Sequence, residues 1–171
     1  MDVNVRAVAE QTDRTLWEVK NVIDCISDAL WTRSFSGAPV YRHVYHMLHS
    51  LDRWFINPND ESYREPSIHV SGLNDLDETL SLYLSRAQIE AYFAEIREKI
   101  GAYVRTLSDE ALREKPPACT HTRLELILGQ LRHLYAHVGM LMGWIIAFDE
   151  KWPLTVGLEK AIPEGKGPHF A

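Results

Sequence analysis

Two histidines one helical turn apart, inside a long apolar run, constrain this chain more than any other feature. His133 and His137 lie in the stretch from about Thr122 to Phe148. At 3.6 residues per turn they share one side of a helix with apolar residues, so both imidazoles point toward a protein core. A buried imidazole has two ring nitrogens that need partners. A metal ion meets that need, and so do hydrogen bonds within the core. The spacing leaves both explanations open.

The composition is that of an ordinary globular protein. A length of 171 residues predicts a single domain over residues 1–171. The net charge of -6, without a Lys- or Arg-rich block, disfavours a nucleic-acid partner. No signal-peptide core follows the N-terminus, and glycines and polar residues interrupt the longest apolar run, so we expect no membrane span and a cytoplasmic location. Cys25 and Cys119 are expected to be free thiols.

Apolar residues recur at alternating spacings of three and four in four segments, which predicts helices over about residues 5–30, 39–56, 86–107 and 123–148. The third and fourth segments begin with capping-box patterns, Ser85 with Gln88 and Thr122 with Glu125. The fourth segment is apolar nearly all round, so we expect the other helices to surround it. No strand-like alternation is present. These patterns predict an all-α four-helix bundle.

Two segments of the chain are irregular in pattern. Residues 57–84 form a long polar and acidic connection between the second and third predicted helices, and such length predicts a lid or a wall of a site. A short helical turn is expected near residues 76–84. The tail over residues 149–171, rich in Pro and Gly, is expected to pack irregularly across the bundle.

Three histidines on the second predicted helix, His43, His46 and His49, are candidates for a third metal ligand. Periodicity places His49 on a solvated face and slightly favours His43 over His46 as the more buried residue. Three neutral imidazoles would leave a position open for water or a thiol. The sequence contains no Glu-x-x-His and no His-Glu-x-x-His, which excludes di-iron carboxylate bundles and that class of metalloprotease.

Residues 44–55 contain His-x-Leu-x-x-x-Asp, and residues 130–139 contain Arg-His-x-x-x-His-x-Gly. These two windows resemble motifs of the DinB-like superfamily. The resemblance extends over roughly residues 16–148. It implies a DinB-like bundle with a long crossover connection between helices two and three, and it implies a homodimer. It also implies a divalent metal ion, nickel or zinc, held by three histidines. By motif position these ligands are His46, His133 and His137.

The resemblance further implies a metal-dependent enzyme acting on a small-molecule substrate. Thiol-dependent S-transferases are known in this superfamily, and a hydrolase would use the same site, so a low-molecular-weight thiol is the expected cosubstrate. Gln130 and His43 are candidates to support the ligands, while Asp52 is expected in a salt bridge or a helix cap. The alternative is a non-catalytic binding or stress-response protein with a structural metal or none.

Overall fold

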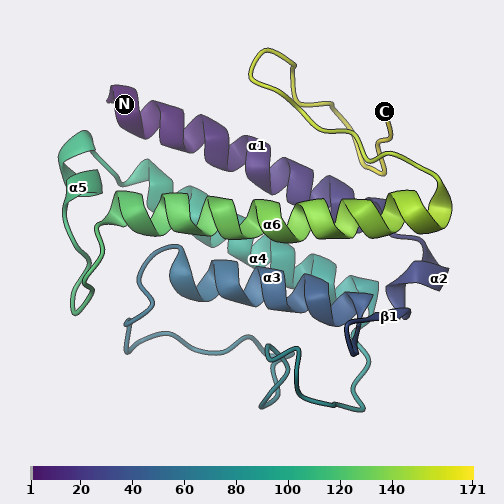
Figure 1. Ribbon diagram of the computed structural model, residues 1–171. Coiled ribbons are helices and arrows are strands. Elements are labelled where there is room, and N and C mark those ends of the chain that lie inside the picture. Colours follow the sequence, from purple (N-terminus) through teal and green to yellow (C-terminus); the bar gives the residue numbers. More distant parts are fainter. Residues whose placement is uncertain (1) are drawn as a thin grey trace.

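Four long helices make up about half of the chain in the computed structural model, which describes residues 2–171 (Figure 1). They are α1 (Val3–Cys25), α3 (Val40–Trp54), α4 (Arg86–Arg105) and α6 (Arg123–Asp149). Two short helices, α2 (Asp28–Trp31) and α5 (Asp109–Arg113), lie in the connections. The chain is therefore mostly helical, as its periodicity predicts.

The long helices enclose one hydrophobic core. Both α1 and α3 pack against α6 on one side and against α4 on the other, so that α4 and α6 lie across the core from each other (Figure 1). The core includes fully buried residues from every long helix, for example Val19, Leu48, Ile89 and Ile145. This arrangement places α3 directly beside the helix that carries His133 and His137.

The first helix is shorter than predicted. It ends at Cys25 rather than near residue 30, because the backbone at Ile26 turns to an extended conformation. Ser27 then caps α2, its side chain accepting a hydrogen bond from the backbone N–H of Leu30 at 3.3 Å. An N-cap residue starts a new helix in a new direction. The alternating apolar pattern continues through this break, which is why the sequence did not reveal it.

A small hairpin precedes α3, although the sequence has no strand-like alternation. Strands β1 (Ser34–Phe35) and β2 (Ala38–Pro39) pair antiparallel. The turn residues Ser36 and Gly37 have positive φ values of 50° and 87°. Two consecutive positive φ values are typical of the tight turns that match strand twist. Strands of two residues are too short for any periodicity to signal them.

The predicted ends of the other helices agree with the structure to within two residues. Both capping boxes are present, at Ser85 before α4 and at Thr122 before α6. In each, the side chain of the cap and that of the third helical residue bond reciprocally to the backbone, which satisfies N–H groups that lack partners at a helix start.

The connection from residue 55 to 85 contains no helix, so the helical turn expected near residues 76–84 is absent. It is nevertheless fixed along α3. The buried guanidinium of Arg42 donates to the backbone carbonyls of Gly72, Asp75 and Glu78. The hydroxyl of Tyr41 donates to the carbonyl of Leu82 at 2.7 Å. Buried backbone carbonyls need such partners, and α3 supplies them, so the connection forms a wall over this helix.

The expectation that other helices surround α6 is wrong. One face of α6 is open, with Leu128 54% and Tyr135 46% exposed. Gly139 and Gly143 lie on the same exposed face. Arg132 also lies on this face, between Leu128 and Tyr135, and no other segment of residues 2–171 covers it.

The tail crosses α1, as predicted. The side-chain amide of Asn21 donates to the backbone carbonyls of Leu154 and His169, at 3.0 and 2.9 Å. Cys25 and Cys119 are both free thiols. Among the helices of residues 2–171, none has the length and apolar character needed to cross a membrane.

Candidate metal centre

Three histidines from two helices converge at the contact between α3 and α6. His133 and His137 lie one turn apart on α6, with ring centroids 4.6 Å apart. His46 of α3 approaches both, with centroid distances of 5.8 Å to His133 and 5.0 Å to His137. One ring nitrogen of each lies within 4.8 Å of the others. The two motif windows therefore meet in space.

The hydrogen bonds of these rings leave nitrogens free for an ion. Nδ1 of His46 lies 2.6 Å from the backbone carbonyl oxygen of Asn74. A carbonyl oxygen only accepts hydrogen bonds, so Nδ1 of His46 carries the proton. Nε2 of His46 therefore keeps its lone pair. Nε2 of His133 and Nδ1 of His137 are buried and have no partner within residues 2–171. Buried polar atoms normally have partners, and a divalent ion suits this set of imidazoles.

Burial keeps the imidazoles of α6 neutral. It lowers the pKa of His137 to about 4, and the neighbouring charges of His133, His46 and His43 act in the same direction. Burial also lowers the pKa of His133, with a smaller effect of His46. A metal binds the neutral imidazole, so these shifts favour a metal-binding form at neutral pH.

His43 and Gln130, the two candidates for a supporting role, lie outside this group. His43 is only 3% exposed, so periodicity correctly ranked it as more buried than His46. Its Nε2–H donates to the carbonyl oxygen of Phe35 at 3.0 Å, and its ring meets the edge of Trp144. Oε1 of Gln130 is buried without a partner among the described residues.

A second cluster was not predicted. It contains His49, expected on a solvated face but only 8% exposed, together with Glu65 and His69 of the connection. Nε2 of His49 donates to Glu65 Oε2 at 2.6 Å. Nδ1 of His69 lies 2.7 Å from the hydroxyl of Tyr45. No periodicity or motif links these residues, because Glu65 and His69 lie in an irregular segment.

Ring orientation distinguishes the two clusters. A ligating nitrogen directs its lone pair in the ring plane, so rings that share an ion need planes that intersect at it. The planes of His46, His133 and His137 are inclined by 48° to 67°. The rings of His49 and His69 are stacked, with 18° between planes and 5.2 Å between centroids. In the second cluster His49 is already hydrogen-bonded to Glu65, so the ring orientations and the free nitrogens together favour the first cluster as the ion site.

A cavity of about 520 Å³ borders His46, one of the three converging histidines. His46 and His49 line it from α3, and Tyr63, Glu65 and Asn74 line it from the connection. This confirms that the connection forms part of a cavity wall. Asp52 lies next to it in the expected salt bridge, with Oδ1 2.6 Å from Nζ of Lys99.

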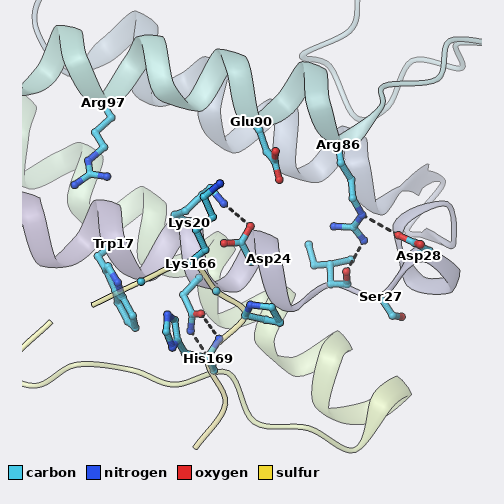
Figure 2. A pocket seen from close by; sticks show the side chains of 15 residues that line it. Trp17, Lys20, Asp24, Ser27, Asp28, Arg86, Glu90, Arg97, Lys166 and His169 are labelled. Carbon is cyan, nitrogen blue, oxygen red and sulfur yellow. Dashed lines mark hydrogen bonds and ion pairs between the residues drawn. The ribbon is translucent and has the colours of Figure 1, made fainter. Parts of the chain in front are cut away.

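A larger cavity, of about 740 Å³, lies elsewhere, between α1, α4 and the tail (Figure 2). Two of its cations are paired with carboxylates in its own wall, Lys20 with Asp24 and Arg86 with Asp28. None of the three converging histidines lines it. The size of this cavity does not by itself indicate a chemical function.

Comparison with known proteins agrees with the motif windows. A family model described as the DinB superfamily matches residues 11–141, which is more than half of the chain and includes all three converging histidines. No curated protein matches the chain, and no solved structure does.

Proposed function

The chain belongs to the DinB superfamily, and from this premise we propose that it is an enzyme that depends on a divalent metal ion, nickel or zinc. His46, His133 and His137 hold the ion. The observation that carries the proposal is the pair of buried, unpartnered nitrogens of His133 and His137 facing a His46 ring that Asn74 orients. The fold that positions them is the four-helix bundle of the family, with the connection after α3 as its crossover.

A thiol-dependent S-transferase is the activity we propose, with hydrolysis as a variant of the same site. When bound, a divalent ion lowers the pKa of a water or thiol in its open position. The protein's own residues orient and enclose the reactants. Asn74 fixes the His46 ring, and the connection walls a cavity large enough for a small molecule. In the reaction the thiol loses its proton, its sulfur forms a bond to an electrophilic carbon of the substrate, and the leaving group on that carbon departs with the electron pair of the broken bond.

An open ligand position favours this activity over a structural metal. A structural zinc site is usually closed by four protein ligands, whereas a catalytic site keeps one position for water or substrate. The converging group within the described residues has three members, and His46 also lines the 520 Å³ cavity.

A homodimer is part of the proposal. Its support is the open face of α6, on which the large side chains of Leu128 and Tyr135 are about half exposed. Glycines on the same face would let a second copy approach closely, since they carry no side chain.

Metal content tests the proposal. Untagged protein should contain about one nickel or zinc ion per chain. His46→Ala, His133→Ala and His137→Ala should each lose the ion, whereas His121→Ala, which removes an exposed histidine, should retain it. Protein that stays metal-free after incubation with nickel and zinc would contradict the proposal. A metal-loaded protein would then be assayed for thiol transfer.

A further inference from the structure

The cavity that borders His46 extends along one face of α3. His46, Ser50 and Arg53 all line it, at helical spacings of four and three. Such residues project from the same side of a helix. His46 therefore marks one end of this row and Arg53, in the last turn of α3, marks the other.

Arg53 is positioned but not paired. Its guanidinium carbon lies 4.4 Å from the centroid of the Tyr63 ring, a cation–π contact that holds the group beside this ring. The nearby carboxylates have other partners, since Asp52 pairs with Lys99 and Glu65 with His49, each at 2.6 Å. Within residues 2–171, Arg53 forms no ion pair. A planar cation with free donors thus borders the cavity.

A free guanidinium in such a position fits a carboxylate. Its N–H groups form two parallel hydrogen bonds with the two oxygens of that anion. A cation in the last turn also interacts favourably with the helix dipole, and that role needs no ligand. If Arg53 only interacts with the helix dipole, a carboxylate on the ligand should not affect binding. If Arg53 binds a carboxylate, ligands that carry one should bind more tightly.

We propose that the molecule bound in this cavity carries a carboxylate, held by Arg53, at the end remote from the three-histidine site. This inference rests on the proposed function for the reactive end of the molecule. Arg53 is seven positions after His46, which corresponds to a rise of about 10 Å along the helix. The site therefore selects a thiol or an electrophile whose carboxylate is about two helical turns from its reacting atom.

A matched pair of ligands tests the proposal. The affinities of 6-mercaptohexanoate and 6-mercaptohexanol for the zinc-loaded protein are measured by calorimetry. The acid should bind about tenfold more tightly than the alcohol, the effect of one charge-assisted pair. The difference should shrink at high salt because the site is partly exposed. Equal affinities, or no binding of either ligand, would overturn the proposal.

Variants assign the effect to one residue. Arg53→Gln should remove the preference for the acid and leave the affinity for the alcohol unchanged. Arg53→Lys keeps the charge but not the paired donors, so it should retain only part of the preference. Arg97→Gln makes the same change of charge in the other cavity (Figure 2) and should behave as the wild type. A preference that survives in Arg53→Gln would contradict the assignment.

The His137→Ala variant separates this proposal from the proposed function. Without the ion, both thiols should bind more weakly while the preference for the acid remains. A protein that binds metal but shows no preference would refute only the carboxylate site. A protein that binds no metal yet prefers the acid would refute only the metal centre.

Discussion

The backbone carbonyl oxygen of Asn74 lies 2.6 Å from Nδ1 of His46. A residue of the irregular connection thus sets the orientation of a ring on α3. Arg42, one turn before His46, holds the flanking carbonyls of Gly72, Asp75 and Glu78 in place. The orientation of a candidate metal ligand therefore depends on a buried arginine that does not touch the site.

Arg42→Leu tests this dependence. The change leaves buried carbonyls without donors, so the free energy of unfolding should fall by about 3 kcal/mol, measured by urea denaturation. Metal affinity should fall by about tenfold or more, because the Asn74 carbonyl no longer orients His46. The exposed Arg105→Leu should change neither. Unchanged metal affinity in Arg42→Leu would show that Asn74 holds its position without the arginine.

The metal-free protein should lose stability on mild acidification. Burial lowers the pKa of His137 from 6.5 to about 4 and lowers that of His133 as well. Between pH 6.5 and 4 the unfolded chain therefore binds more protons than the folded chain, and stability falls as the pH drops through this window. Urea midpoints at pH 7 and pH 5 measure the loss. His137→Gln should show a smaller loss, and an equal loss would speak against this origin.

Thr122→Ala should destabilise the protein by about 1 kcal/mol. The change removes the hydroxyl that accepts from the backbone N–H of Glu125 at 3.2 Å and leaves a helix-start donor unsatisfied. Thermal or urea denaturation measures the effect. Thr122→Ser keeps the hydroxyl and should be close to the wild type. Similar losses in both variants would point to packing rather than capping.

His69→Ala should leave the metal stoichiometry unchanged. The ring of His69 is nearly parallel to that of His49, with 18° between planes, and Nε2 of His49 is already bonded to Glu65, so we expect no ion in this cluster. Metal analysis of the variant, beside His133→Ala as the variant that loses the ion, provides the measurement. Loss of an ion in His69→Ala would mean that the second cluster also binds metal.

Gly139→Arg should convert the proposed homodimer to a monomer. Nothing lies within 4 Å of a Cβ added at this position, and the position is exposed, so we expect the folded chain to accommodate an arginine that projects from the open face of α6. Light scattering after size-exclusion chromatography gives the mass. Gly157→Arg, equally open but in the tail, serves as the control. A wild-type protein that is monomeric at high concentration would refute the dimer.

The sequence by itself determined the helices and the residues of the first histidine group. Helical periodicity and capping residues act locally, over three or four positions, so α3, α4 and α6 could be predicted to within two residues. The pair His133 and His137 was visible for the same reason. Periodicity alone favoured His43 as the more buried histidine of α3, and only the family motif identified His46.

Only the tertiary structure decided what surrounds these residues. The connection has no periodicity, so nothing in its sequence indicated that Asn74 would meet His46 or that Glu65 would meet His49. Those contacts arise because the carbonyls of an irregular segment need donors, and α3 presents them at one face. The open face of α6 could not be predicted because α6 does have a regular apolar pattern, and that pattern suggested a buried helix. A pattern of apolar residues records what a helix can bury, whereas the positions of the other helices decide what it does bury.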